Sequence, residues 1–368
     1  MSNILFVVSN LKVGGLQKIV TLISSKLSEF NSVSLFVFNK GEFYQTDLRI
    51  EHSEKNIGHF ALNMTEKIRK YISKKLSHKE ELNNFYYRRL VNSIKKNNIQ
   101  TIILTEYSIL YAPKLRKQFN ELKIIIWIHN NYNIYFNEYF KNYRNSLMES
   151  IKIANKVVVL TELDKISFSR HSKNVIKIIN PLSIDPQGLS SSLLENNISI
   201  TCRYSIDHKG LDYLIKVSKS LPKEWKISIA GTGTKKEIAE LLKMIKLNNV
   251  ENSIVLLGSL KGKKLLDHYK NSSIYIMTSR WEGMPLVLVE AMSFGLPVIS
   301  FENSGSNEIL ENGKYGILVE QGNVEEFSKK LNCMISNYER RKEYSKKSLQ
   351  RVKDFEISRI VKQWEEII

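Results

Sequence analysis

Short apolar runs alternate with longer amphipathic stretches along the whole chain, and this alternation limits the fold more than any other feature. In runs such as 4–8 and 274–277 every residue is apolar, so both faces of the strand that each run predicts must be buried. Strands buried on both faces and separated by helices are typical of parallel sheets with helices on each side. The sequence therefore predicts a doubly wound α/β protein. The predicted strands are 4–8, 33–38, 101–104, 124–128, 157–160, 175–179, 198–201, 226–230, 254–257, 274–277, 297–300 and 317–319.

A change of composition near the middle of the chain predicts a domain boundary. With 368 residues the chain is longer than one ordinary hydrophobic core organises. Residues 180–192, NPLSIDPQGLSSS, lack periodicity and are typical of a linker. We expect Rossmann-like domains over 1–182 and 183–350, and a final amphipathic helix within 351–368. Ligands of such sheets bind beyond the carboxyl ends of the strands, so we expect a site in a cleft between the two domains.

Cysteine content and apolar run lengths narrow the compartment. Cys202 and Cys333 offer neither a disulfide framework nor metal-ligand spacing, which fits a reducing cytoplasm. No apolar run approaches the roughly 18 residues of a membrane span. The run at 4–8 predicts a strand and not a secretion signal. We expect a cytoplasmic protein, soluble or peripheral on the inner face of the cell membrane.

The formal net charge of +18 calls for an anionic partner or for a highly solvated surface. Segment 67–96 holds ten Lys or Arg against two Glu, with Tyr71, Phe85, Tyr86 and Tyr87 among them. Such a mixture suits an anionic membrane surface, and it fits a solvated helical face equally well. No nucleic-acid recognition motif accompanies the charge, so we expect no nucleic-acid partner.

Residues 279–300, SRWEGMPLVLVEAMSFGLPVIS, place two carboxylates in a very apolar setting. Glu282 precedes a Gly-Met-Pro turn, and Glu290 lies inside the helix that Pro285 is predicted to open. An uncompensated buried carboxylate costs several kcal/mol, so each needs a partner. The helix N-terminus favours an anion nearby, and carboxylates accept paired hydroxyls such as those of sugars. The alternative for Glu290 is a structural carboxylate satisfied by Arg280 or another base.

Two cations follow the strand predicted at 198–201. Arg203 lies in the loop, and Lys209 with Gly210 is predicted to open the next helix. Because a helix start is already positive, two cations there make sense if a diphosphate lies between them. No cluster of His, Cys or Asp has metal-ligand spacing, and we expect no metal.

Glycine turns and one histidine follow other predicted strands. Gly14-Gly15 and the turn of Gly231 and Gly233 do not complete a G-x-G-x-x-G pattern, so we expect no nicotinamide cofactor. His129 follows the strand at 124–128 and would face the cleft. In the turn at 305–310, we predict that Glu308 caps the helix. Taken alone, His129 is more typical of an ordinary satisfied polar residue, and its position among the other strand-end residues favours a role in the site.

Together these residues resemble the retaining GT-B glycosyltransferases of the large family called group 1. EGMPLVLVE, residues 282–290, resembles the E-x7-E signature, and Arg203 with Lys209-Gly210 resembles the basic pair. AGTG and Gly14-Gly15 resemble the glycine turns of the family, and the resemblance extends over essentially the whole chain. The chain departs from it at Cys202, where the family usually has glycine.

The resemblance implies metal-independent transfer of a hexosyl group from a nucleotide-sugar, a UDP-sugar by default, with retention of configuration. Arg203 and Lys209 would hold the diphosphate, and Glu282 with the amides of Gly283 and Met284 would contact the sugar. Glu290 would bind the ribose hydroxyls, and His129 would lie near the reacting carbon. The remaining donor-binding residues that the resemblance implies are Gly14, Gly15, Gly231, Gly233, Pro285 and Leu286. It also implies that 1–182 is the acceptor-side domain, that 183–350 binds the nucleotide-sugar donor, and that the helix within 351–368 crosses back onto the first domain.

For the acceptor we expect a lipid-linked glycan of a bacterial surface polysaccharide, because segment 67–96 suits a membrane surface. A soluble sugar, a protein or a small metabolite is the alternative acceptor. Two further hypotheses are a catalytically inactive nucleotide-sugar-binding protein and, on charge alone, a nucleic-acid-binding protein.

Overall fold

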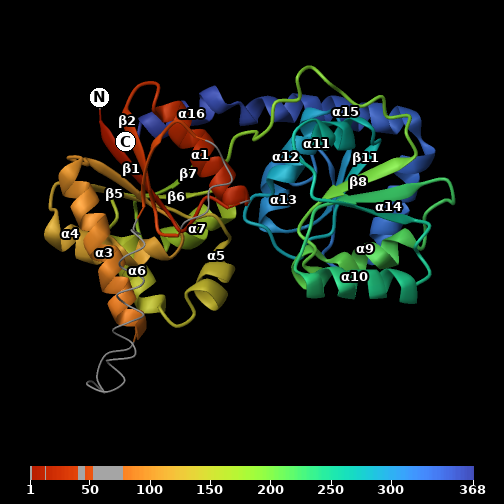
Figure 1. Ribbon diagram of the computed structural model, residues 1–368. Helices are drawn as coiled ribbons and strands as arrows, with labels where there is room; N and C mark the ends of the chain where they lie inside the picture. Colours follow the sequence, from red (N-terminus) through yellow and green to blue (C-terminus); the bar gives the residue numbers. More distant parts are fainter. Residues whose placement is uncertain (1, 13, 40–45, 53–77) are drawn as a thin grey trace. The chain divides into compact units, whose positions relative to one another are not determined.

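The protein divides into two compact units, which Figure 1 shows as ribbons. Unit 1 comprises Met1–Ile178 and Ile360–Ile368, and unit 2 comprises Ile179–Arg359. Each unit contains one parallel sheet and its own helices, so the predicted class of two doubly wound α/β domains is confirmed. The structure is a computed structural model, and it describes residues 2–12, 14–39, 46–52 and 78–368.

The sheet of unit 1 has seven strands in the order β3-β2-β1-β4-β5-β6-β7. The chain runs from β1 to one edge and then returns to pair β4 with the other side of β1. The strands are β1 (Asn3–Val8), β2 (Ser32–Val37), β3 (Arg49–His52), β4 (Thr101–Leu104), β5 (Lys123–Trp127), β6 (Lys156–Val159) and β7 (Val175–Lys177). The helices are α1 (Gly15–Leu27), α3 (His78–Lys96), η1 (Glu106–Tyr111), α4 (Ala112–Gln118), α5 (Tyr132–Ile134), the π-helix η2 (Tyr135–Tyr139), α6 (Arg144–Ile153) and α7 (Glu162–Ser169).

The sheet of unit 2 has six strands in the order β10-β9-β8-β11-β12-β13. Here β8 lies between β9 and β11, so the loops after these strands meet at one edge. The strands are β8 (Asn197–Thr201), β9 (Lys226–Ala230), β10 (Ile254–Gly258), β11 (Ile274–Met277), β12 (Val298–Phe301) and β13 (Ile317–Val319). The helices are α8 (Ile206–Lys209), α9 (Leu211–Ser218), α10 (Lys235–Leu247), α11 (Lys263–Lys270), α12 (Leu286–Ser293), α13 (Ser304–Ile309), α14 (Val324–Ser336), α15 (Tyr338–Val352) and η3 (Lys353–Phe355).

All the predicted strands are present, with ends that shift by a residue or two, and the described residues contain one further strand. β3 reads RIEH and pairs with β2 at the end of the sheet. A strand at the end of a sheet has one unpaired edge and tolerates charged side chains. No apolar run marks β3, and the sequence analysis therefore missed it.

The prediction that Lys209-Gly210 opens a helix is confirmed for Gly210, which is the N-cap of α9, and is wrong for Lys209. Lys209 ends the short helix α8, and Gly210 separates α8 from α9 with a left-handed φ of 58°. Glycine is the residue that most readily adopts this conformation after a helix, so the pair closes one helix before the next begins.

The last helix, α16 (Ile357–Glu365), joins unit 1 from Ile360 onward. Its Trp364 is fully buried, with its ring 4.6 Å from that of Trp127 and 6.4 Å from that of Phe6. Lys123 Nζ donates to the backbone oxygen of Ile368 at 2.9 Å. The expected return of the last helix to the first domain is therefore confirmed. Among the described residues, no helix combines the length and the apolar character needed to cross a membrane.

Candidate functional site

Two loops are held together at the carboxyl edge of the sheet in unit 2. They follow β8 and β11, which are neighbours in the sheet. Thr278 Oγ1 donates to the backbone oxygen of Lys209 at 2.9 Å. The backbone amide of Arg280 donates to the backbone oxygen of His208, also at 2.9 Å. A side chain at Gly210 would collide with the carbonyl of Thr278. The close approach of the loops therefore requires glycine at this position.

The centre of this edge is an ion pair between Lys209 and Glu282. Lys209 Nζ lies 2.6 Å from Glu282 Oε1, and the two side chains are only 17% and 12% exposed. Burial pushes the pKa of Glu282 upward, but the charge of Lys209 and then of His208 outweighs it and leaves the pKa below its usual range. Glu282 is therefore ionised at neutral pH. The buried carboxylate has its partner in the cation that follows β8.

Arg203 lies on the same edge and is accessible to a ligand. Its side chain is 64% exposed, and Nη2 donates to Glu237 Oε2 at 3.3 Å. The turn after β9 lies beside it, because a side chain at Gly231 would collide with the carbonyl of Cys202. Burial raises the pKa of the Cys202 thiol to about 12, so it is neutral. Gly233, in the same turn, packs against Tyr204 and Glu237.

Glu290 lies deeper in unit 2 and is hydrogen-bonded within the protein. It is 4% exposed, and its carboxylate accepts from Ser183 Oγ at 2.5 Å and from Tyr269 OH at 2.9 Å. Arg280, the base that the sequence suggested, pairs instead with both carboxylate oxygens of Asp212, at 2.9 and 2.8 Å. Glu290 thus accepts from two hydroxyl groups, which is the kind of donor that a ribose offers.

The turn between Glu282 and helix α12 packs against the start of α13. Ser304 Oγ donates to the backbone oxygen of Glu282 at 3.0 Å, and Gly305 lies so close to Gly283 that an added Cβ would be 2.9 Å from its carbonyl oxygen. Met284 is buried and its sulfur accepts from the amide of Asn180 at 3.2 Å. The backbone of this turn is therefore held in place from several sides.

Two predicted details of these helices are wrong. Pro285 is the N-cap of α12 with extended backbone angles, and Leu286 is the first helical residue. The cap of α13 is Asn303, which forms a capping box with Ser306, and not Glu308. An Asn three residues before a Ser satisfies the free amides of a helix start directly, and Glu308 lies too far along the helix to do so.

His208 and Trp281 form a stacked pair beside the ion pair, which the sequence analysis missed. Their rings are 4.7 Å apart and 9° from parallel, and a hydrogen bond of 3.0 Å joins His208 Nε2 to the backbone oxygen of Trp281. Burial, followed by the charge of Lys209, lowers the pKa of His208. The sequence does indicate this pair, because His208 directly precedes Lys209 and Trp281 directly precedes Glu282, and both of these were predicted site residues.

In unit 1 the predicted site residues lie at the carboxyl ends of β1 and β5. Gly14 is the N-cap of α1 and Gly15 its first residue. His129 follows β5, with its ring 4.2 Å from that of Trp127. Its Nε2 is buried without a hydrogen-bond partner among the described residues. Burial lowers the pKa of His129 to about 3, so the ring is neutral at pH 7.

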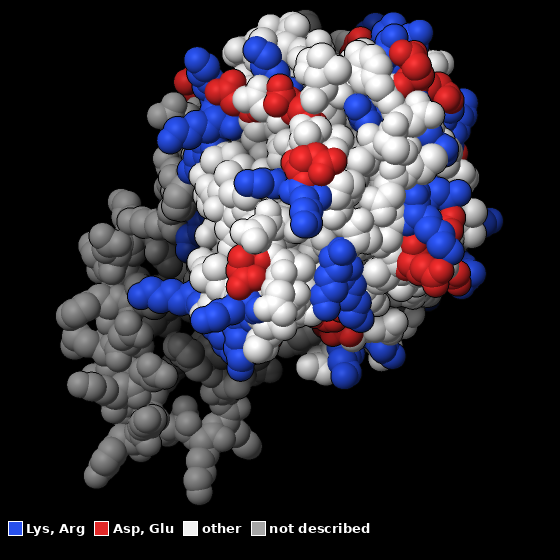
Figure 2. Space-filling model, turned by 90° about the vertical axis from the view of Figure 1, so that its right-hand side faces the viewer, with Lys and Arg blue, Asp and Glu red and all other residues white. Residues whose placement is uncertain are grey.

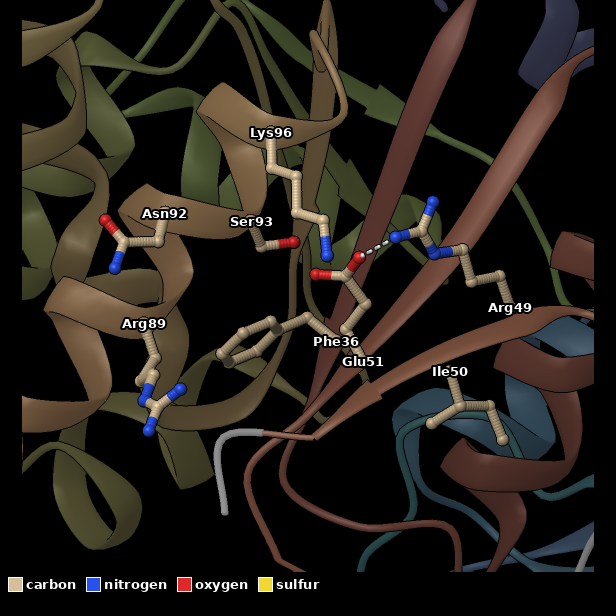
Figure 3. A pocket seen from close by; sticks show the side chains of 8 residues that line it. All are labelled: Phe36, Arg49, Ile50, Glu51, Arg89, Asn92, Ser93 and Lys96. Carbon is tan, nitrogen blue, oxygen red and sulfur yellow. Dashed lines mark ion pairs between the residues drawn. The ribbon is translucent and has the colours of Figure 1, made fainter. Parts of the chain in front are cut away.

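A cavity of about 350 Å³ lies elsewhere in unit 1, between β3 and α3, and Figure 3 shows its lining. Arg49 Nη2 lies 3.0 Å from Glu51 Oε1, and Lys96 also points toward Glu51. These elements carry none of the predicted site residues. The lining residues are Phe36, Arg49, Ile50, Glu51, Arg89, Asn92, Ser93 and Lys96.

Helices of both units carry pairs of opposite charges three or four residues apart, such as Lys165–Glu162 at 3.5 Å in unit 1. Of the basic segment 67–96, residues 67–77, including Tyr71, lie outside the described residues. Unit 2 pairs charges along its helices, as in Lys329–Glu325 at 2.7 Å and Lys347–Glu343 at 2.7 Å. Figure 2 shows one face of the molecule, on which Lys and Arg side chains lie beside Asp and Glu side chains. In the part of the chain that the structure describes, no group of three or more His, Cys, Asp or Glu could hold a metal ion.

Comparison with known proteins identifies the family to which the chain belongs. The model of the family "Glycosyl transferases group 1" matches residues 193–351, which lie inside unit 2. An uncharacterized glycosyltransferase of Haemophilus influenzae is 31% identical over 310 residues, 82% of this chain and 86% of that protein. The chain therefore belongs to the group 1 glycosyltransferases and is an enzyme of that class.

Other relatives match the chain over nearly its whole length. The amylovoran biosynthesis glycosyltransferase AmsD of Erwinia amylovora is 27% identical, over 96% of both chains. An α-1,4-N-acetyl-D-galactosaminyltransferase of Campylobacter jejuni, named for an acceptor on PP-undecaprenol, is 24% identical over 100% of this chain and 98% of its own.

Solved structures share the fold. Sucrose-phosphate synthase of Thermosynechococcus elongatus superposes with a TM-score of 0.82 at 14% identity, over 100% of this chain and 98% of its own. Anabaena HepE in complex with UDP-glucose has a TM-score of 0.80 at 17% identity, over 100% and 99%. The two-domain GT-B fold expected from the sequence is thereby confirmed.

Proposed function

We propose that this glycosyltransferase moves a hexosyl group from a UDP-sugar to a lipid-linked glycan, with retention of configuration and without a metal ion. The observation that carries the proposal is the arrangement of Arg203, Lys209 and Glu282 in adjoining loops at one sheet edge. Two cations and a sugar-binding carboxylate at strand ends are the parts that a nucleotide-sugar requires.

The donor diphosphate would lie between Arg203 and Lys209. Arg203 is exposed and can grip two oxygens, whereas Lys209 would exchange part of its contact with Glu282 for a phosphate. Glu282, released from the full ion pair, would accept hydroxyls of the sugar together with the amides of Gly283 and Met284. Donor binding thus converts a resting ion pair into two ligand contacts.

The chemical step requires stabilisation of the departing diphosphate. Fixed cations and amides supply it, because they face the charge that develops on the leaving group. In the front-face displacement implied by the resemblance, the leaving phosphate helps to deprotonate the acceptor hydroxyl, and no protein nucleophile is required. His129, neutral at pH 7, would contact the donor sugar near the reacting carbon. Glu290 would bind the ribose hydroxyls, in exchange for one of its protein hydroxyl partners.

The relatives support the donor and the acceptor. HepE was crystallised with UDP-glucose, and the Campylobacter jejuni transferase is named for an acceptor on PP-undecaprenol. A lipid-linked acceptor places the enzyme at the inner face of the cell membrane, where the described part of segment 67–96 offers Arg88, Arg89, Lys95 and Lys96. Flotation with vesicles containing anionic lipid tests this part, and absence of binding would leave a soluble acceptor as the better candidate.

Thermal unfolding with a panel of nucleotide-sugars, without added metal, tests the donor assignment. A ligand at about a hundred times its dissociation constant adds roughly 2.7 kcal/mol of stability. We expect one UDP-sugar to stabilise the wild type but neither Arg203→Ala nor Glu290→Ala. Arg340→Ala is the control, because Arg340 is a partly exposed arginine on helix α15 of the same unit. If no nucleotide-sugar shifts the wild type, or if both site variants shift as much as the control, the donor assignment is wrong.

A further inference from the structure

The carboxyl edge of unit 1 carries a polar and aromatic surface that the donor site does not use. It consists of Glu106, Tyr107, Asn130 and Tyr139, and we call it the tyrosine–carboxylate surface. Glu106 and Tyr107 open η1 after β4, and Asn130 follows the neighbouring strand β5. Tyr139 ends the π-helix η2. π-Helices are rare and occur frequently at functional sites.

Glu106 is held in an unusual conformation. Its φ of 50° is left-handed, which is uncommon for a residue with a side chain and is concentrated at functional sites. The amide of Ser9 donates to Glu106 Oε2 at 2.9 Å, and the hydroxyl of Ser9 donates to the same oxygen. Among the described residues no hydrogen bond ends on Oε1. The carboxylate is therefore fixed in direction with one oxygen available to a ligand.

The two tyrosine rings are exposed and yet fixed. Tyr107 is 62% exposed and Tyr139 48%. Tyr107 OH donates to the backbone oxygen of Tyr139 at 3.1 Å, and the Tyr107 ring lies 5.2 Å from that of Phe140. Asn130 Nδ2 donates to Tyr139 OH at 3.1 Å. Rigid aromatic rings that remain exposed to water are typical of binding surfaces. Their apolar area contributes favourable free energy only when a ligand covers it.

We propose that the tyrosine–carboxylate surface binds a neutral pyranose ring of the glycan acceptor. A pyranose has C–H groups on its faces, which pack on aromatic rings, and hydroxyls at its rim, which a carboxylate and an amide can bind. A few polar groups beside aromatic side chains are the usual composition of a small-molecule site. The inference deepens the proposed function, since it assigns the sugar acceptor to named residues.

The charge of the surface separates acceptor from donor. A diphosphate needs cations, which unit 2 presents at its own edge as Arg203 and Lys209. Glu106 would repel a phosphate or an acidic sugar at close range. The surface therefore selects an uncharged sugar, and this selection distinguishes it from the basic cavity between β3 and α3.

Saturation-transfer difference NMR tests the surface with a defined probe. Methyl glycosides of glucose, galactose, N-acetylglucosamine and N-acetylgalactosamine are added to the full chain. We expect the wild type to saturate at least one of them, and Tyr107→Ala and Tyr139→Ala to abolish the signal. Tyr107→Trp should retain it, because the ring remains. Phe30→Ala is the control, since Phe30 is 64% exposed and follows α1 at the other end of the sheet.

The same variants separate this inference from the proposed function. Thermal stabilisation by the UDP-sugar should be unchanged in Tyr107→Ala and Tyr139→Ala, whereas KM for a glycan acceptor should rise at least tenfold with kcat little changed. Wild-type acceptor KM in both variants, or no saturation of any glycoside by the wild type, would overturn the inference while the donor assignment stands. Absence of stabilisation by any nucleotide-sugar would overturn the proposed function instead.

Discussion

The carboxyl edges of the two sheets are built by different means. In unit 2 the loops after β8 and β11 are joined by ion pairs, Lys209–Glu282 and Arg280–Asp212, and by a glycine contact at Gly210. In unit 1 the corresponding loops are held mainly by aromatic contacts and single hydrogen bonds, and two tyrosines remain exposed. A charged nucleotide-sugar is bound by fixed charges of opposite sign, whereas an uncharged sugar is bound by packing on exposed aromatic rings and by hydrogen bonds. The contrast therefore fits the division of substrates that we propose.

The net charge follows the same division. Unit 1 holds 29 Lys or Arg and 16 Asp or Glu, whereas unit 2 holds 26 and 21. Most of the basic excess thus belongs to unit 1, which we propose binds the acceptor, and not to unit 2, which contains Arg203 and Lys209. This distribution is compatible with the membrane surface that we propose as a partner of unit 1.

Removing the cation from the edge of unit 2 should have the largest effect on stability. Lys209→Met leaves Glu282 mostly buried without its partner, which costs about 3 kcal/mol. Urea unfolding at pH 7 measures the loss. The pKa of folded Glu282 lies below the ordinary value of 4.5, so the ion pair stabilises the wild type above pH 4.5. The wild type loses this stabilisation as the pH falls through the pKa of folded Glu282. The gap between variant and wild type should therefore narrow in acid.

The double variant Lys209→Met/Glu282→Gln is the control for this experiment. It removes both charges, so it should recover most of the lost stability. Equal stability of Lys209→Met and the wild type at pH 7 would show that the edge of unit 2 is not held by the ion pair.

A buried histidine should give unit 1 its own pH dependence. The pKa of His129 is lowered to about 3 by burial, whereas the unfolded chain binds that proton near 6.5. Stability should therefore fall as the pH drops from about 6.5 toward 3, by about 2 kcal/mol at pH 5. Urea unfolding at pH 7.5 and pH 5 measures this, and His129→Gln should remove it.

The matched control is His268→Gln in unit 2, where burial lowers the pKa of His268 to about 4. This variant should remove the pH dependence of stability that His268 contributes and leave the pH dependence that His129 contributes unchanged. An unchanged pH dependence in His129→Gln would mean that the edge of unit 1 is more hydrated than its packing on Trp127 indicates.

The hydrogen bond to Glu290 should have the smallest effect of the three. Tyr269→Phe removes a hydroxyl that donates to a buried carboxylate at 2.9 Å, which costs about 1.5 kcal/mol. Tyr204→Phe is the comparison, because that hydroxyl donates to the neutral backbone oxygen of Ile229 at 3.3 Å and should cost about 1 kcal/mol or less. The midpoints of urea unfolding of the two variants and the wild type measure the two losses of stability. Equal losses would argue that the network around Glu290 is not charge-assisted.

Most of the fold and part of the site could be read from local patterns. Apolar runs predicted the strands, and the position of Arg203, Lys209 and Glu282 just after strands placed them at one edge. The pattern failed at β3, whose sequence RIEH has no apolar run, and at Lys209-Gly210, where only the backbone shows that one helix ends before another starts. Apolar runs and the positions of residues just after strands are both local signals. They predict helices and strands, but not the contacts between these elements.

The sequence by itself determined the class of fold and the family, because these depend on patterns that extend over a few positions. It also predicted which residue types lie together at the candidate site of unit 2. The pairing of Lys209 with Glu282, the hydroxyl partners of Glu290 and the left-handed Glu106 beside Ser9 were decided only by the tertiary structure. The contacts of Lys209 with Glu282, of Ser183 with Glu290 and of Ser9 with Glu106 join residues 73, 107 and 97 positions apart. Tyr269 is 21 positions from Glu290, and the conformation of Glu106 depends on a single backbone angle. Their formation follows from the order of the strands in each sheet, since β1 pairs with β4 and β8 with β11 across long intervening segments.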